Sequence, residues 1–153
     1  YDPNLRLPLW ESPKAAKDGI MSIWETADII KISDEELEFL TGENTDASAE
    51  SLMFEDLKLL LVTEGPNGAR YYTPEFKGQV DGVKVDAIDT TGAGDAFVAG
   101  LLSKLVQNKS ILQNKAELEA AIRFANVAGA ITTTGRGAIP SLPSMTQISE
   151  FDA

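Results

Sequence analysis

Two short apolar runs, residues 27–32 (ADIIKI) and 57–65 (LKLLLVTEG), most constrain how this chain can fold. Each is rich in Ile, Leu or Val and too short for a helix, which is typical of a strand buried on both faces. Between them, residues 33–42 (SDEELEFLTG) predict a helix, in which Ser33 and Glu36 form a capping box and a glycine marks the end. This alternation predicts an α/β protein with a mainly parallel sheet covered by helices.

The remaining elements follow from the same signals. Further helices are expected at 12–26, 49–57, 93–107 and 114–131 and after residue 144, with further strands at 69–73 and within 77–89. No repeat or linker divides the chain, so residues 1–153 are expected to form a single partial domain. The first residue is Tyr1 rather than Met, and its segment resembles the end of a strand, so we expect a piece of a longer protein.

Composition narrows the chemistry that is open to this chain. The 24 acidic and 13 basic residues give a formal net charge of −11, which argues against nucleic acid as a partner. Apolar runs are too short for a membrane span. The chain has neither cysteine nor histidine, so thiolate nucleophiles, Ser-His-Asp triads and Cys- or His-ligated zinc are excluded. Acid–base chemistry must use carboxylates, Lys or Tyr, and a metal would be a hard cation such as Mg²⁺.

A glycine-acid loop, residues 89–100 (DTTGAGDAFVAG), follows a predicted strand and opens a predicted helix. Gly92 and Gly94 allow a ligand to approach the main chain, and the first N–H groups of a helix form a site for an anion. Asp95 lies at this opening, where an ionised carboxylate can accept a proton from an attacking hydroxyl. The alternative is a plain helix start, with Asp95 as a favourable charge. The loop matches neither the dinucleotide fingerprint, because Phe97 replaces the third glycine, nor a Walker A loop.

This loop closely resembles the second signature of the ribokinase-type sugar kinases, also called the phosphofructokinase-B family. The resemblance extends over nearly the whole chain, through YDPNLR, ADIIKISDEELEFLTG, LLLVTEGPNGARYY and FANVAGAITTTGRGAIPSLPS. It is greatest to the C-terminal half of a plant-type fructokinase. The resemblance implies the C-terminal portion of a three-layer α/β/α ribokinase-like (Rossmann-like) fold. It also implies transfer of phosphate from ATP to a sugar, with fructose giving fructose 6-phosphate. Another sugar kinase of the family, of the ribokinase or 2-keto-3-deoxygluconate kinase type, and a non-catalytic nucleotide-binding module stay as alternatives.

The resemblance also implies roles for residues of the glycine-acid loop. Asp95 would be the base that takes the hydroxyl proton. The N–H groups of Gly92, Ala93 and Gly94 would form the anion hole for the transferred phosphoryl group. Both roles agree with the local physics, because phosphoryl transfer depends mostly on positioning and charge stabilisation.

Further roles implied by the resemblance concern ATP and metal ions. Residues expected to contact the nucleotide are Thr63, Gly65, Gly68, Asn126 and Gly137. Glu36 would act on Mg²⁺ through water, although Ser33 replaces the usual Asn and the capping box already explains this pair. A monovalent cation such as K⁺ would be held with the help of Asp89, Thr91 and Ser141.

The opening segment is the candidate for substrate contacts. Asp2, Asn4 and Arg6 alternate, so an extended chain would present all three on one face, and Arg suits phosphate or sugar oxygens. The alternative is a surface salt bridge with a proline turn. The family's main sugar-binding residues lie in an N-terminal half that these residues do not include, so the chain alone is expected to be inactive or nearly so. The expected location is the cytoplasm, with the plastid as the alternative, and a homodimer of the full-length parent is left open.

Overall fold

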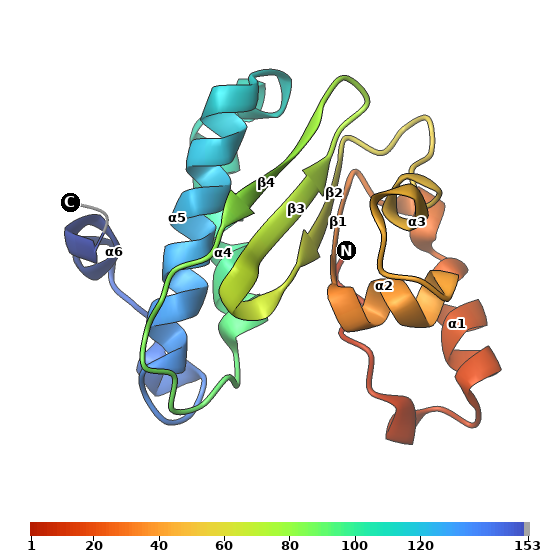
Figure 1. Cartoon of the computed structure of the whole chain (residues 1–153), viewed down its shortest axis with the longest axis horizontal. Coiled ribbons are helices and arrows are strands. Elements are labelled where there is room, and N and C mark those ends of the chain that lie inside the picture. Colours follow the sequence, from red (N-terminus) through yellow and green to blue (C-terminus); the bar gives the residue numbers. More distant parts are fainter. Residues whose placement is uncertain (152–153) are drawn as a thin grey trace. The chain divides into compact units, whose positions relative to one another are not determined.

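The computed structural model describes residues 1–151 (Figure 1). Its helices are α1 (Pro13–Met21), α2 (Asp34–Thr41), α3 (Asp46–Glu50), α4 (Ala93–Gln107), α5 (Lys115–Thr133) and α6 (Met145–Phe151). Its strands are β1 (Ile29–Ser33), β2 (Leu59–Thr63), β3 (Gly68–Tyr72) and β4 (Lys77–Asp81). A short 3-10 turn, Gly65–Asn67, joins β2 to β3.

The four strands form one sheet in the order β1–β2–β3–β4. β1 and β2 are parallel, with Ile29 opposite Leu59 and Ser33 opposite Thr63. The connections from β2 to β3 and from β3 to β4 are too short for a parallel crossover, which needs about a dozen residues or more. They are therefore hairpins and the sheet is mixed. The predicted α/β class is confirmed, whereas the expectation of a mainly parallel sheet is wrong.

Burial along the strands explains why two of them are so clear in the sequence. β2 is buried at four successive residues from Leu59 to Val62, as expected for a strand covered on both faces. β1 alternates between buried and half-buried residues. β4, at the edge of the sheet, has no buried residue, so its hydrophobic signal is weak.

The described chain divides into two compact units. The first comprises residues 1–64 and 70–78 and contains β1, β2 and α1 to α3. Its core joins these elements through Ile20, Trp24, Ile30, Ile32, Leu37, Leu40, Ala49, Leu57, Leu60, Val62 and Tyr72. Tyr1 pairs with β1, because its amino group donates to the Ile29 carbonyl at 2.7 Å and its carbonyl accepts from the Lys31 N–H at 3.0 Å.

Two helices of this unit differ from their predicted bounds. The helix expected over 12–26 begins behind the predicted cap, with the Ser12 hydroxyl accepting from the Ala15 N–H at 3.1 Å, but it ends at Met21. The helix expected over 49–57 is wrong in position, because α3 begins at Asp46 behind the Thr45 cap and ends at Glu50. Within 77–89, β4 is the one strand that the structure describes.

The second unit comprises residues 65–69 and the described residues from 79 onwards, and it contains α4, α5 and α6. α4 and α5 lie side by side, with α4 behind α5 in Figure 1. They approach closely at Gly100, where an added Cβ would lie 3.2 Å from the Ala125 Cα. A second cluster of buried residues, Val83, Val127, Ala128 and Ile148, joins α5 to α6 and to the segment after β4.

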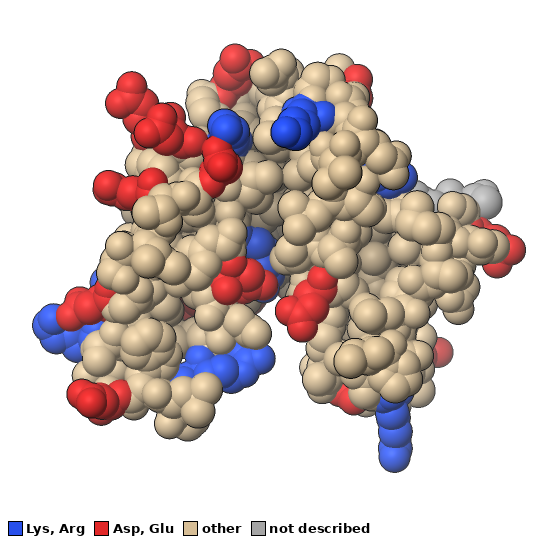
Figure 2. All heavy atoms as spheres, turned by 180° about the vertical axis from the view of Figure 1, so that it is seen from behind, with Lys and Arg blue, Asp and Glu red and all other residues tan. Residues whose placement is uncertain are grey.

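The surface matches the acidic composition. On the face seen in Figure 2, acidic side chains are distributed widely and basic side chains are scattered among them. Among residues 1–151, no helix is both long and apolar enough to cross a membrane.

Candidate functional site

The glycine-acid loop forms the N-terminal opening of α4. Gly92 is the N-cap residue, and its backbone lies in the left-handed region at φ 82° and ψ 0°. A side chain there would be strained by that φ and would also meet Ala138, whose Cβ lies 2.6 Å from the position of an added Cβ. The structure therefore requires glycine at this position for both backbone and packing reasons. Residues 92–95 are called the α4 opening below.

The cap of α4 differs from those of the other helices. Ser12, Ser33, Thr45 and Asn114 cap α1, α2, α3 and α5, and each side chain accepts a hydrogen bond from an N–H of the first turn. Gly92 has no side chain to do so, and no described side chain caps α4. The N–H groups at its start are therefore left without a capping side chain, at a place where the helix dipole adds partial positive charge and favours an anion.

Asp95 lies in the first turn of α4 and is exposed. Among the described residues, no hydrogen bond or ion pair occupies its carboxylate. The Ala93 N–H donates to the Thr90 carbonyl at 3.2 Å, so this member of the predicted anion hole already has a partner. An accessible carboxylate thus lies directly beside uncapped N–H groups, which is an arrangement suited to a base next to an anion.

Asp89, at the start of the loop, is joined to the segment after α5. Its Oδ1 accepts from the Thr91 hydroxyl at 2.6 Å and from the Thr91 N–H at 3.0 Å, and its Oδ2 accepts from the Gly137 N–H at 2.9 Å. The hydrogen bond from the Thr91 hydroxyl, followed by those from the Gly137 and Thr91 backbones, lowers the pKa of Asp89 to about 2. Ser141 lies in the same segment and its hydroxyl donates to the Arg136 carbonyl at 3.3 Å. The structure thus brings together three predicted site residues, Asp89, Thr91 and Gly137.

The remaining nucleotide candidates lie on and after β2. In the first unit, Thr63 ends β2 and its hydroxyl donates to the Ile32 carbonyl of β1 at 3.3 Å. In the second unit, Gly65 is exposed and begins the 3-10 turn, whereas Gly68 is buried and begins β3. Residues 65–68 are called the Gly65–Gly68 turn below. This turn is held to the segment after β4, because the Gly82 N–H donates to the Asn67 carbonyl at 3.1 Å.

Asn126 is a buried polar side chain of α5, with 8% of its surface exposed. Its Nδ2 donates to the Val80 carbonyl at 3.2 Å and to the Asp81 carbonyl at 3.1 Å. The amide nitrogen thereby bonds to two carbonyls at the end of β4. The resemblance implied that Asn126 contacts the nucleotide, and the structure shows that its side chain joins α5 to β4.

Glu36, in the first unit, makes the predicted capping box. Its N–H donates to the Ser33 hydroxyl at 3.1 Å, and its Oε2 accepts from the Ser33 N–H at 2.7 Å. Its Oε1 accepts from the Leu5 N–H at 2.6 Å, and the residue is 7% exposed. Both carboxylate oxygens therefore serve backbone N–H groups. Within residues 1–151, no three acidic side chains cluster as a metal site would need.

The opening segment is not an extended strand that presents its polar side chains on one face. Asn4 has a φ of 46°, and the Asp2 Oδ1 accepts from the Asn4 N–H at 3.1 Å, so the chain turns here. The Asp2 Oδ2 also pairs with Lys31 at 3.3 Å. Asn4 and Arg6 are both exposed, and the Arg6 Nη1 donates to the Leu5 carbonyl at 3.0 Å. The one-face arrangement expected from alternation is thus wrong, while both candidate side chains reach the surface.

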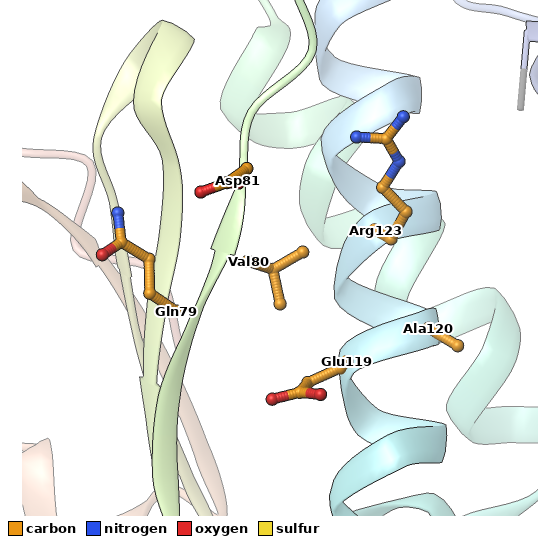
Figure 3. A pocket seen from close by; sticks show the side chains of 6 residues that line it. All are labelled: Gln79, Val80, Asp81, Glu119, Ala120 and Arg123. Atoms are coloured by element: carbon orange, nitrogen blue, oxygen red, sulfur yellow. The ribbon is translucent and has the colours of Figure 1, made fainter.

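An open surface groove of about 430 Å³ lies between β4 and α5 in the second unit (Figure 3). It is lined by Gln79, Val80, Asp81, Glu119, Ala120 and Arg123. None of the residues predicted from the sequence lines it. Asn126 lies three residues after Arg123 on α5, next to the carbonyls of Val80 and Asp81.

Two residues that contact the loop 88–95 were not predicted from the sequence. Ala138 packs against Gly92, and the Thr133 carbonyl accepts from the N–H groups of Ile88 and Asp89 at 2.7 and 3.1 Å. Both lie more than 40 residues from their partners along the chain, and neither residue type carries a chemical signal. Only the three-dimensional packing identifies them.

The fold places the chain among α/β proteins, and comparison with known families identifies its class: it belongs to the pfkB family of carbohydrate kinases, which it matches over residues 1–145. It is 56% identical over 155 residues to "Probable fructokinase-7" of Arabidopsis thaliana, covering 99% of this chain and 45% of that protein. It is 53% identical over 155 residues to "Fructokinase-2" of Zea mays, covering 100% of this chain and 46% of that protein.

A solved structure shares the fold. The fructokinase from Vibrio cholerae O395, in its fructose, ADP and calcium ion bound form, has a TM-score of 0.86 and 38% sequence identity, covering 98% of this chain and 49% of that one. The fold is therefore ribokinase-like. The chain spans about half the length of these relatives.

Proposed function

We propose that this chain is the C-terminal, ATP-binding and catalytic part of a longer fructokinase, with residues 1–153 as a single partial domain. The full protein transfers the γ-phosphoryl group of ATP to a hydroxyl of fructose and forms fructose 6-phosphate. Family membership and the likeness to plant proteins named fructokinases support the reaction class and the sugar. The observation that carries the proposal is the exposed Asp95 carboxylate in the uncapped first turn of α4.

In this proposal Asp95 accepts the proton of the sugar hydroxyl as the hydroxyl oxygen attacks the γ-phosphorus. The bond to the ADP oxygen breaks and ADP leaves. The backbone N–H groups of Gly92, Ala93 and Gly94 stabilise negative charge on the transferred group, with Ala93 first giving up its 3.2 Å bond to Thr90. Thr63, Gly65, Gly68 and Gly137 contact the nucleotide, and Asn4 and Arg6 face the sugar or phosphate.

In this proposal, the divalent metal ion is bound mainly by the phosphates of the nucleotide. Related structures contain ADP with a calcium or potassium ion, and ATP with Mg²⁺. Mg²⁺ keeps several of its waters and is usually held by the substrate phosphates, which fits a chain whose described residues form no acidic cluster. Glu36 would act only through water, because both its oxygens already accept backbone N–H groups. Asp89, Thr91 and Ser141 are the proposed neighbours of a monovalent cation.

For location we propose the cytoplasm, with the plastid as the alternative. One relative from Arabidopsis thaliana, 59% identical over 153 residues, is named "Probable fructokinase-6, chloroplastic". Fractionation of plant cells that express the full-length protein with a fluorescent tag separates the two. A homodimer of the full-length parent is a further proposal, which sedimentation of that protein tests.

The first test is ADP release by the full-length protein with ATP and Mg²⁺, with and without fructose. Fructose should stimulate release, and Asp95→Asn should lower the stimulated rate by about 10²- to 10⁴-fold. Asp86→Asn, which changes an exposed carboxylate of the same unit, is the matched control and should keep the rate. An Asp95→Asn protein that retains its rate would refute the catalytic assignment.

The sugar is tested with a panel that includes fructose, ribose and 2-keto-3-deoxygluconate. The highest kcat/KM should belong to fructose. A preference for another sugar would assign the protein to a different sugar kinase of the same family. ATP binding without turnover of any sugar would instead support a non-catalytic nucleotide-binding module. Residues 1–153 expressed alone should show little or no turnover, because the chain lacks half the length of its relatives.

A further inference from the structure

The side chain of Asn126 is hydrogen-bonded to the backbone of β4. Its Nδ2 donates to the carbonyls of Val80 and Asp81 at 3.2 and 3.1 Å, and the side chain is almost fully buried. β4 is an edge strand that ends at Asp81, so its carbonyls need partners from outside the sheet. Asn126 therefore fixes the end of β4 to α5.

The segment that Asn126 holds is in direct backbone contact with the Gly65–Gly68 turn. The Gly82 N–H donates to the Asn67 carbonyl at 3.1 Å. A Cβ at Gly68 would overlap the Val80 carbonyl, and a Cβ at Gly82 would overlap the Pro66 carbonyl. Because no space separates these two stretches of backbone, a shift of residues 80–82 shifts the turn as well.

The same face of α5 also supports the α4 opening. Gly129 lies three residues after Asn126, so the two positions are neighbours on the helix surface. An added Cβ at Gly129 would lie 3.1 Å from the Ala93 carbonyl and 3.7 Å from the Phe97 Cβ. One turn of α5 thus holds the start of α4 with its glycine and the end of β4 with its asparagine.

The open groove beside β4 makes the Asn126 hydrogen bonds more important for holding this strand to α5. Figure 3 shows the side chains of Glu119, Ala120 and Arg123 along α5 and those of Gln79 and Asp81 on β4. These residues line an open groove of about 430 Å³. Since Gln79 and Asp81 are exposed beside this groove, few side chains pack against this side of β4. The Asn126 amide is a buried group that bridges the two elements at the next turn of the helix.

We infer that Asn126 is a positioning residue: it sets the distance between the Gly65–Gly68 turn and the α4 opening through α5, and it does not read the nucleotide base. The inference rests on the proposed function, in which that turn contacts ATP and that opening holds Asp95. It predicts that loss of the clamp weakens nucleotide binding whatever the base, since the turn rather than a base contact is disturbed.

The test compares ATP with GTP as phosphoryl donors for the full-length protein and its Asn126→Leu variant. We expect the KM values for ATP and GTP to rise by the same factor, about ten-fold, which is the scale of a lost net hydrogen bond with a buried carbonyl left unpaired. The ratio of the two kcat/KM values and the KM for fructose should stay within two-fold. Gly129→Ala, which presses on Ala93, should lower kcat and leave the KM for ATP unchanged.

Thr132→Val is the matched control, because Thr132 is as deeply buried on α5 but its hydroxyl donates within its own helix, to the Ala128 carbonyl at 2.9 Å. It should change stability without changing either nucleotide KM. A ten-fold change in the ATP to GTP preference of Asn126→Leu would overturn the inference in favour of a base contact, and unchanged KM values would overturn it as well. If Asn126→Leu fails to fold, Asn126→Ser gives the same comparison. If the unsubstituted protein lacks fructose-stimulated turnover, the proposed function fails, and calorimetric ATP and GTP affinities of the same variants still test the clamp.

Discussion

Gly92→Ala is the substitution whose cost the structure defines most sharply. Two separate penalties apply to it. The backbone at φ 82° costs a residue with a Cβ about 1–2 kcal/mol. The new Cβ would also lie 2.6 Å from the Ala138 Cβ and 3.1 Å from its Cα, an overlap of the kind that costs about 1–3 kcal/mol when a packed region must move. Together they predict a loss of about 2–5 kcal/mol in the free energy of unfolding.

Gly42→Ala separates the two penalties. Gly42 ends α2 with a similar φ of 92°, but an added Cβ there meets nothing within 4 Å. It should therefore lose only the backbone part, about 1–2 kcal/mol. The double variant Gly92→Ala with Ala138→Gly removes one of the two overlapping atoms and should recover part of the difference.

The assay is urea unfolding of the full-length variants, followed by fructose-stimulated ADP release from the folded proteins. Gly92→Ala should lose activity as well as stability, because movement of the 135–141 segment disturbs the α4 opening. Gly42→Ala should keep its activity. Equal destabilisation by the two substitutions would show that Ala138 yields without cost, and would refute the claim that packing, as well as φ, requires glycine at 92.

Three further substitutions test other contacts. Asp89→Asn removes a carboxyl whose pKa is lowered from 3.8 to about 2 in the folded protein. The stabilising effect of this carboxylate is therefore present above pH 3.8 and is lost as the pH falls to 2. In urea unfolding at stepped pH, the unfolding free energy of the variant should decline less across that window than that of the unsubstituted protein. Glu36→Gln should cost about 1–2 kcal/mol of unfolding free energy, because an amide nitrogen cannot accept the backbone N–H groups that the two carboxylate oxygens accept, and a selective loss of Mg²⁺ affinity would instead support the metal role. Tyr72→Phe should cost about 1 kcal/mol in the same assay, since its hydroxyl donates to Asp46 at 2.6 Å and accepts from Arg70 at 3.3 Å; no loss would show that this network is not stabilising.

The elements that the sequence predicted well are those defined by local chemistry. The bounds of α4 and the caps of α1 and α2 agree with the structure because a cap and its helix lie within three or four residues of each other. β2 was clear because burial on both faces leaves an uninterrupted apolar run. α3 was misplaced because Thr45 competes as a cap with a stronger apolar pattern further on, whose Leu57 is buried without being helical.

For the candidate site, too, the sequence predicted local features but not contacts between residues far apart in the chain. The loop 89–100 could be identified from its residues, since glycine, acid and helix start are adjacent there. The hydrogen bond from Gly137 to Asp89 spans 48 residues, and only the family resemblance placed both in one site. The partners of Asn126 lie 45 and 46 residues away, and they are backbone carbonyls that no sequence pattern marks.

The cap of α4 unites these observations. α1, α2, α3 and α5 each begin behind a residue in the extended region whose side chain accepts an N–H, which is the stabilising choice for a helix. At α4 a left-handed glycine excludes both that backbone and that side chain, and Ala138 leaves no room for a replacement. A helix start that served stability alone would gain from a serine or threonine in the extended conformation. Keeping N–H groups uncapped next to an exposed Asp95 makes sense where an anion binds, and it supports the proposal that this opening serves phosphoryl transfer to a hydroxyl.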